Sequence, residues 1–327
     1  MGPVGTSAVS PGRAPQVEVF PGPSRQSLAI RRVLQVSVRP LLDLWSFTPA
    51  LPWPYLVVDA AGRALPPLPH TTTRPVRLAH CRAEWLRSPS KHPVPRRAGA
   101  RRAILYLHGG GFVCCGLHSH RRLVSRISAA CAAPALLVDY RQLPGTPVSR
   151  SVDDCLDGYR WLRQRGYRPE EIVFVGDSAG GYLAFMSAIV AHERRLGYPG
   201  AVVGLSPFID TDPTRREDSF GDMWDPLFTP NSLRTHNKVI TRAEGRMVRS
   251  PVDADLWGMP PVLVQCGADE LLSVDAQMIT AHVAAAGGEA RLEMYEGQFH
   301  VFQAAADLVP EARTAISRIG EFVRSLA

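Results

Sequence analysis

Short apolar runs that alternate with helical patterns are the feature that most constrains the fold of this chain. The apolar runs lie at residues 103–107, 135–140, 172–175, 201–205, 262–266 and 291–295. Helical patterns lie between or after most of them, at residues 151–165, 178–193, 274–286 and 311–326. Strands that are apolar throughout, and that alternate with helices, are typical of a parallel sheet buried on both faces. The sequence therefore predicts an α/β fold with helices on both sides of a mostly parallel sheet.

The chain before this core divides into two segments. Residues 1–26 are rich in Pro, Gly and Ser, and we expect them to be disordered. Residues 27–46 have apolar side chains at helical spacing, and Pro40 should kink this helix or begin a second one. Its apolar face either covers a groove on the rest of the protein or lies on a membrane surface, and we favour the cover. Residues 76–86 are expected to form one or two edge strands.

One long insertion interrupts the alternation, at residues 207–250. It is rich in Pro, Asp and Arg and carries the aromatic residues Phe220, Trp224 and Phe228. Insertions of this length in a compact domain usually serve as lids or binding elements. We expect the same role here.

Composition excludes several classes of protein. The 327 residues carry a formal charge of +7, but the positive residues are nearly all scattered arginines without a nucleic-acid-binding motif, so we expect no nucleic-acid partner. The six cysteines form neither a CxxC pair nor a Cys/His metal spacing, which predicts free thiols in a reducing compartment and no metal. No apolar run reaches 18 residues, and Arg31 and Arg32 interrupt the only stretch that resembles a signal peptide. We expect a cytoplasmic location, with association with the cell envelope as the alternative.

The strongest chemical signal is the sequence Gly176-Asp177-Ser178-Ala179-Gly180, which follows an apolar strand and precedes a helical pattern. This is G-x-S-x-G in the strand–turn–helix setting that holds a nucleophilic serine in a strained turn. The glycines leave room for that turn, and the helix N-terminus favours a developing oxyanion. We therefore assign the nucleophile to Ser178 and interpret Asp177 as a structural hydrogen-bonding residue.

A second signal, His108-Gly109-Gly110-Gly111-Phe112, ends the strand at residues 103–107. A tetrahedral intermediate needs backbone N–H donors aimed at its oxygen, and glycines let the backbone approach closely. Gly110 and Gly111 are candidates for the oxyanion hole, with the N–H of Ala179 as third donor. We expect His108 to shape this loop rather than to act in catalysis.

A serine nucleophile needs a histidine base and a carboxylate that orients the base. Among the histidines after Ser178, His192 and His282 fall within helical patterns and His236 falls in the insertion, whereas His300 follows the strand at 291–295. We therefore assign the base to His300.

The carboxylate should likewise follow a strand. Asp269 is the first acidic residue after the strand at 262–266, and we assign the acid to it. Glu270 and Asp275 are the alternatives. Asp275 should open a helix, and Glu270 should point away from its neighbour.

Together these residues resemble the hormone-sensitive-lipase family of esterases within the α/β-hydrolase superfamily. The resemblance spans residues 74–326 and is carried by the HGGGF and GDSAGG blocks. It implies a cap made from residues 27–60 and 207–250, on a core of residues 61–206 and 251–327. It also implies a triad of Ser178, Asp269 and His300, oxyanion donors at Gly110, Gly111 and Ala179, and short- to medium-chain acyl substrates. The chain departs from the family at Gly145, where a glutamate is expected, and Cys114 and Cys115 follow the oxyanion loop where the family varies.

We therefore predict a cofactor-independent serine carboxylesterase that acts on small esters through an acyl-enzyme. One alternative is an amide or N-acetyl hydrolase, which the same triad supports. Another is a ligand receptor on a hydrolase scaffold, which the complete set of triad residues argues against. The helix at 27–46 leaves weak lipid association as a minority interpretation, and no motif indicates an oligomeric state.

Overall fold

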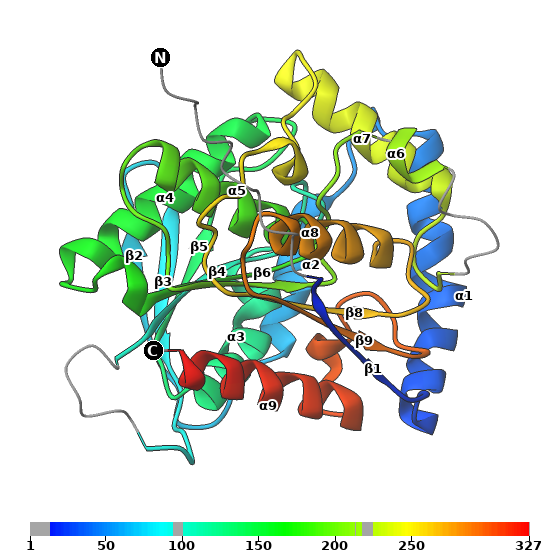
Figure 1. Ribbon diagram of the computed structural model, residues 1–327. Coiled ribbons are helices and arrows are strands. Elements are labelled where there is room, and N and C mark those ends of the chain that lie inside the picture. Colours follow the sequence, from blue (N-terminus) through cyan, green and yellow to red (C-terminus); the bar gives the residue numbers. More distant parts are fainter. Residues whose placement is uncertain (1–13, 94–100, 213, 218–224, 327) are drawn as a thin grey trace, which may run out of the picture.

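A computed structural model describes residues 14–93, 101–212, 214–217 and 225–326. Within these residues, the strands join in a nine-stranded sheet in the order β1-β9-β8-β7-β6-β4-β5-β3-β2 (Figure 1). The strands are β1 (Gln16–Phe20), β2 (Thr72–Arg77), β3 (Arg82–Arg87), β4 (Ala103–Leu107), β5 (Ala135–Asp139), β6 (Ile172–Asp177), β7 (Ala201–Leu205), β8 (Val262–Gly267) and β9 (Ala290–Tyr295).

The pairing confirms the predicted mostly parallel sheet. Only β3 pairs antiparallel, with β2 on one side and with β5 on the other, and every other pairing is parallel. Strands β4, β6, β7 and β8 are buried at every residue, which explains why their sequences are apolar without alternation. The expected edge strands are β2 and β3, which form a hairpin, but only β2 lies at the edge of the sheet, since β3 pairs with β5 as well as with β2.

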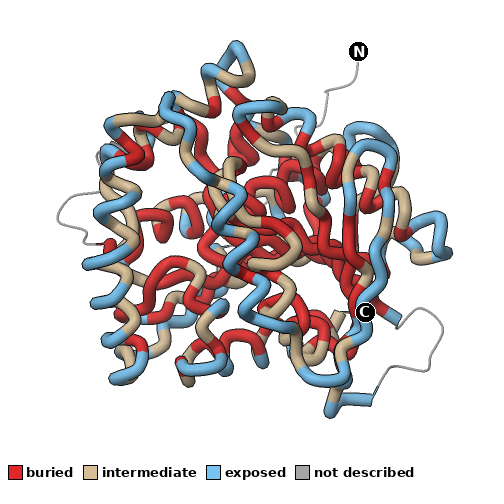
Figure 2. The backbone as a smooth tube through the Cα atoms, turned by 180° about the vertical axis from the view of Figure 1, so that it is seen from behind, coloured by how far each residue is buried: buried red, intermediate tan, exposed pale blue. Residues whose placement is uncertain are grey.

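Helices cover both faces of the sheet (Figure 1). One face carries α3 (Leu117–Cys131) and α9 (Pro310–Ser325), and the other carries α4 (Val148–Gln164), α5 (Ala179–Glu193) and α8 (Ser273–Ala285). Single 3-10 turns lie at η1 (Gly62–Ala64), η2 (Pro169–Glu171), η3 (Pro251–Asp253) and η4 (Phe302–Ala305). Seen from behind, buried strands fill the middle of the molecule and exposed segments surround them (Figure 2). The four predicted helices are confirmed, whereas α3 was not among them.

The expected disorder of residues 1–26 is wrong for part of that segment. Residues 1–13 lie outside the described residues, but β1 adds a parallel edge strand to β9. Its last residue, Phe20, stacks on Tyr295 with ring centroids 4.4 Å apart, and the guanidinium of Arg318 lies 4.7 Å from the Phe20 ring. These contacts, rather than a long apolar run, hold the strand in place.

The N-terminal helix and the insertion lie against each other. Helix α1 (Arg25–Phe47) continues through Pro40 and is followed by α2 (Tyr55–Ala61), while the insertion contains α6 (Thr214–Glu217) and α7 (Pro230–Glu244). Thr229 donates a hydrogen bond of 2.8 Å to Asp43 of α1. Asn231 donates another of 2.8 Å to the Ser46 hydroxyl. Phe220 and Trp224 of the insertion lie outside the described residues.

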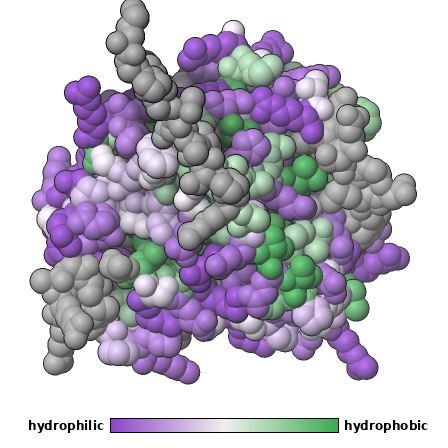
Figure 3. Space-filling model, viewed as in Figure 1, coloured by the Kyte–Doolittle hydropathy of each residue, from purple (hydrophilic) through white to green (hydrophobic). Residues whose placement is uncertain are grey.

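The surface in the view of Figure 3 is mostly hydrophilic, with smaller hydrophobic patches between the polar groups. Among the helices of the described residues, none combines the length and apolarity needed to cross a bilayer.

Candidate active site

Ser178 lies in the sharp turn between β6 and α5. Its backbone has φ 53° and ψ −122°, a conformation that a non-glycine residue rarely adopts. The turn is held because the Ser178 N–H donates to the Leu205 carbonyl at 2.9 Å, while the Ser178 carbonyl accepts from Gly181 and Phe208, each at 2.9 Å. The predicted strained turn at the start of a helix is thus present around Ser178.

The glycine-rich loop after β4 lies beside this turn. Gly110, Gly111 and Phe112 have consecutive positive φ angles of 107°, 61° and 59°. A Cβ atom on Gly110 would lie 2.1 Å from the Cys114 carbonyl oxygen, so only glycine fits there. A Cβ atom on Gly109 would lie 3.1 Å from the Ser178 Cβ, which shows how close the loop is to the serine.

His300 lies in the loop after β9, where its side chain is buried. Its Nδ1–H donates to the Oε2 of Glu270 at 3.0 Å. Its Nε2 is also buried and has no hydrogen-bond partner among the described residues. The imidazole is therefore held through one nitrogen, while the other remains available.

The structure corrects the assignment of the acid. It places Glu270, not Asp269, against His300, because the turn after β8 sends these two neighbours in opposite directions. Asp269 is half-exposed, accepts a hydrogen bond of 3.1 Å from the Gly297 N–H and lies 3.5 Å from Arg31. Glu270 is fully buried and reaches back, so that its Oε1 accepts from the Gly267 N–H at 3.1 Å.

Burial and charge act against each other in this pair. Burial alone would lower the pKa of His300, but the hydrogen bond and the charge of Glu270 raise it above its ordinary value, with help from Asp225. Burial raises the pKa of Glu270, while His300 and the Ser206 hydroxyl partly offset that rise. Glu270 thus makes His300 a stronger base.

The insertion contributes two residues to the surroundings of His300. Asp225 is buried, and its Oδ2 accepts from the N–H of Leu271 at 2.9 Å, one residue after Glu270. The ring of Phe228 meets the His300 ring edge to face, with centroids 4.8 Å apart. Helix α7 adds His236, whose ring lies parallel to that of Phe112 at 6.0 Å in the glycine-rich loop. The insertion therefore packs directly over the candidate site.

Asp177 and His108, which the sequence predicts to be structural, both have buried side chains held by neighbouring residues. Asp177 accepts from the Tyr106 hydroxyl at 2.8 Å, and its other oxygen lies 3.2 Å from the His120 Nε2. Burial alone would lower the pKa of His120, but Asp177 raises it to about 9, so the pair is ionic. His108 stacks on Tyr140 at 4.3 Å, its Nδ1 lies 2.7 Å from the Gly109 carbonyl oxygen, and burial lowers its pKa to about 4. His108 is thus a neutral residue that supports the loop.

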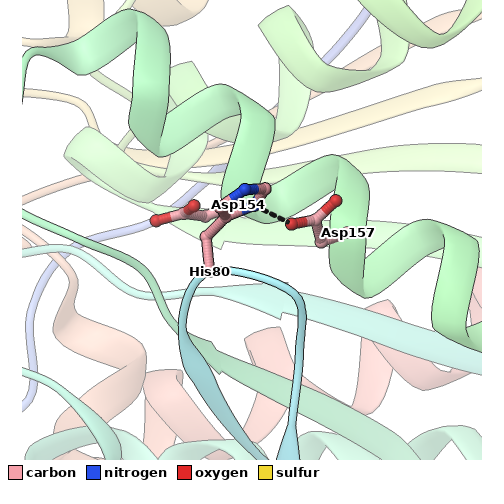
Figure 4. Close-up of side chains that lie close together, drawn as sticks. All are labelled: His80, Asp154 and Asp157. Atoms are coloured by element: carbon pink, nitrogen blue, oxygen red, sulfur yellow. Dashed lines mark hydrogen bonds and ion pairs between the residues drawn. The ribbon is translucent and has the colours of Figure 1, made fainter.

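A second group of titratable side chains lies between the β2–β3 hairpin and α4 (Figure 4). His80 Nδ1 is 2.7 Å from Asp157 Oδ2, and Asp154 lies beside them. Asp154 accepts hydrogen bonds from the Arg141 guanidinium at 2.7 Å and from its backbone N–H at 2.9 Å. Because Arg141 already neutralises the buried carboxylate, we interpret the group as support for the loop that contains Gly145.

Comparison with known proteins places the chain in a family. Residues 104–304, which include Ser178, Glu270 and His300, match the family model of the alpha/beta hydrolase fold. The crystal structure of an esterase from the bacterial hormone-sensitive lipase family superposes with a TM-score of 0.79 at 30% identity, over 94% of this chain and 99% of that one. This chain is a member of the hormone-sensitive-lipase family of α/β-hydrolases.

Several relatives of the chain are named esterases. Esterase LipU of Mycobacterium tuberculosis is 38% identical over 298 residues, covering 88% of this chain and 99% of LipU. The carboxylesterase/phospholipase LipF of the same organism is 36% identical over 315 residues, covering 93% of this chain and 82% of LipF. The structure of EstE5 superposes with a TM-score of 0.80 at 31% identity, over 93% of this chain and 99% of EstE5. The chain is accordingly a carboxylic ester hydrolase of the hormone-sensitive-lipase family.

Proposed function

We propose that the chain is a serine carboxylesterase whose triad is Ser178, His300 and Glu270, and that it works through an acyl-enzyme. Two observations carry this proposal: the buried hydrogen bond of 3.0 Å between His300 Nδ1 and Glu270, and the strained turn that holds Ser178. It is the arrangement that a serine hydroxyl needs, because a base must take its proton and a carboxylate must orient that base.

The reaction follows from these groups. His300 takes the proton of Ser178 through Nε2 as the hydroxyl oxygen attacks the ester carbonyl. Glu270 stabilises the imidazolium that forms. His300 then gives its proton to the leaving alcohol, and the acyl group remains on Ser178. Water, deprotonated by the same histidine, attacks the acyl-enzyme and releases the acid.

The oxyanion of each tetrahedral intermediate is assigned to the backbone N–H groups of Gly110, Gly111 and Ala179. The positive φ angles of the glycine-rich loop and the position of Ala179 as the first residue of α5 support this assignment. Donors fixed in this way stabilise developing charge without reorganising during the reaction.

We infer substrates with short- to medium-chain acyl groups. Two features support this inference. The insertion packs over His300 through Phe228, which limits the room beside the base. In addition, a relative from Streptomyces hygroscopicus that is 32% identical over 257 residues is named an acetyl-hydrolase.

We also infer that residues 27–60 and 207–250 together form the cap. The hydrogen bonds between α1 and the insertion support this inference.

The outward side of α1 keeps Val33, Val36 and Phe47 exposed, which supports weak contact with a lipid surface as a secondary property. Co-sedimentation with liposomes checks this, because Phe47→Ser should reduce the bound fraction and an unchanged fraction would contradict the contact.

A burst titration with p-nitrophenyl butyrate tests the acyl-enzyme. Wild type should release p-nitrophenol in a burst equal to the enzyme concentration, followed by turnover, and Ser178→Ala should show neither. Turnover by folded Ser178→Ala at the wild-type rate would refute the proposal. The same assay with the matched anilide separates an esterase from an amide hydrolase, since an amidase would cleave the anilide at a comparable rate.

A further inference from the structure

The two adjacent cysteines after the oxyanion loop form a feature that ester hydrolysis does not use. Cys114 and Cys115 are free thiols whose sulfur atoms lie 3.8 Å apart. Consecutive side chains usually diverge, but Cys115 has a φ angle of 70°, which turns the chain and brings the second thiol back beside the first.

The thiols line a pocket of about 530 Å³. Trp53, Tyr55 and Leu56 of the N-terminal segment form one wall, and the segment with the two cysteines forms another. Gln142 also lines this pocket; its Nε2 donates to the Cys115 carbonyl at 3.0 Å, while its Oε1 is buried without a hydrogen-bond partner among the described residues. The lining of the pocket thus includes both cysteines and the Gln142 Oε1, which accepts no hydrogen bond among the described residues, and the pocket has room for a ligand.

The spacing of the sulfurs fits one soft centre bound to both. Zinc in proteins is tetrahedral with Zn–S bonds of about 2.3 Å, which places two sulfur ligands about 3.8 Å apart. That is the separation found here, so neither side chain has to move far. Thiolates also favour soft centres over magnesium or calcium, which take oxygen ligands.

We propose that Cys114 and Cys115 form a two-thiolate site for a single soft metal or metalloid centre, of the class of zinc, cadmium or trivalent arsenic, and that the occupied site inhibits hydrolysis. A divalent cation displaces the two thiol protons to solvent. An arsenic(III) oxide forms two As–S bonds, and its oxygen leaves as water with the two thiol protons. Neither reaction requires an oxidant.

The peptide unit between Gly110 and Gly111 connects the two cysteines to the proposed oxyanion hole. The carbonyl of Gly110 accepts from the N–H groups of Val113 and Cys114, at 3.1 and 3.0 Å, and from the Cys114 thiol at 3.3 Å. That carbonyl and the Gly111 N–H belong to the same planar peptide, so bonds to the carbonyl set the direction of the N–H. A bound centre removes the thiol proton and places a thiolate against the carbonyl. The peptide then turns, and its N–H no longer meets the oxyanion. This inhibition rests on the proposed oxyanion hole, whereas the binding itself does not.

Phenylarsine oxide is the most specific probe of the paired thiols, because it binds two neighbouring thiols and needs no other ligand. Native mass spectrometry should show one phenylarsine group per wild-type chain and none on Cys114→Ser or Cys115→Ser. Cys81→Ser is the matched control, because Cys81 is also partly exposed but lies on the β2–β3 hairpin, and it should bind like wild type. Circular dichroism checks that each variant is folded, and Cys115→Ala provides a second substitution if the serine variant is not. An unmodified wild-type chain, or equal labelling of Cys115→Ser, would overturn the site.

Activity provides the second readout, with each variant compared with its own untreated rate. Phenylarsine oxide should lower the wild-type kcat at least tenfold in step with labelling. A dithiol should restore it, whereas an equal concentration of monothiol should not. A labelled wild type with unchanged kcat would overturn the inhibition. If untreated wild type hydrolyses no ester, the proposed function fails, and the mass measurement still tests the site.

A comparison of zinc with phenylarsine oxide distinguishes binding of a metal cation from binding of a metalloid. Zinc takes four ligands, so it should use the Oε1 of Gln142 in addition to the sulfurs, and Gln142→Leu should weaken inhibition by zinc while leaving labelling by phenylarsine oxide unchanged. Equal loss of both would contradict a role for Gln142 as a ligand.

Discussion

The buried ion pair behind the nucleophile predicts a specific dependence of stability on pH. His120 lies 3.2 Å from Asp177 and is buried, and Asp177 raises its pKa from 6.5 to about 9. Because one pKa unit corresponds to about 1.4 kcal/mol, this pair stabilises the folded state by roughly 3 kcal/mol below pH 6.5. A group whose pKa is raised on folding loses that contribution as the pH rises through its folded-state value. The contribution should therefore fall by about 2 kcal/mol between about pH 7.5 and pH 10.

The assay is urea unfolding of wild type and His120→Gln at several pH values in this range. Gln keeps a hydrogen-bond donor and removes the charge, so the free energies of unfolding of the two proteins should converge as the pH rises. His282→Gln, at an exposed position on α8, is the control and should follow wild type throughout. A difference between wild type and His120→Gln that stays constant from pH 7.5 to pH 10 would refute the ionic pair.

Two further predictions concern the turn and the cap. A Cβ atom on Gly180 would lie 1.9 Å from the Leu107 carbonyl oxygen, so Gly180→Ala should lower the unfolding free energy by more than about 3 kcal/mol and abolish activity. Gly22→Ala is the control and should change neither, because a Cβ atom on Gly22 would have no other atom within 4 Å. A stable and active Gly180→Ala would contradict the close packing at this turn. Thr229 is the N-cap of α7 and also bonds Asp43 of α1, so Thr229→Ala should lower the unfolding free energy by about 1 kcal/mol. Steady-state kinetics with p-nitrophenyl butyrate should show its effect mainly in KM, and a large fall in kcat with unchanged KM would argue against a cap that only shapes substrate binding.

The sequence predicts those parts of the fold in which burial on both faces requires apolar residues. Strands β4 to β8 are mostly apolar because both of their faces are covered, and this pattern can be recognised without any knowledge of neighbouring residues. Strand β1 could not be predicted in this way. Its five residues are mostly exposed, and its position depends on the stacking of Phe20 on Tyr295, a contact across 275 residues of sequence. Helix α7 did carry readable signals, since Thr229-Pro230 begins it and Gly245 ends it in the left-handed conformation.

The candidate site shows the same division. Ser178 and His300 follow from their places after strands, and the structure puts each where a strand of the sheet ends. The carboxylate does not follow from such a place, because Asp269 and Glu270 both come directly after β8. Which of the two faces His300 depends on the dihedral angles of a single turn and on the hydrogen bond from Gly267 to Glu270, and neither is encoded in residue type.

The most direct test of the triad compares Glu270→Gln with Asp269→Asn in steady-state hydrolysis of p-nitrophenyl butyrate. Both substitutions replace one carboxylate with its amide, at adjacent positions, so they differ only in which carboxylate is lost. Thermal unfolding verifies that both variants are folded. Glu270→Gln should lower kcat by roughly 10³- to 10⁴-fold, as expected when the triad acid is neutralised, while Asp269→Asn should lower it less than about tenfold. A large loss in Asp269→Asn beside a nearly normal Glu270→Gln would contradict the triad proposed here.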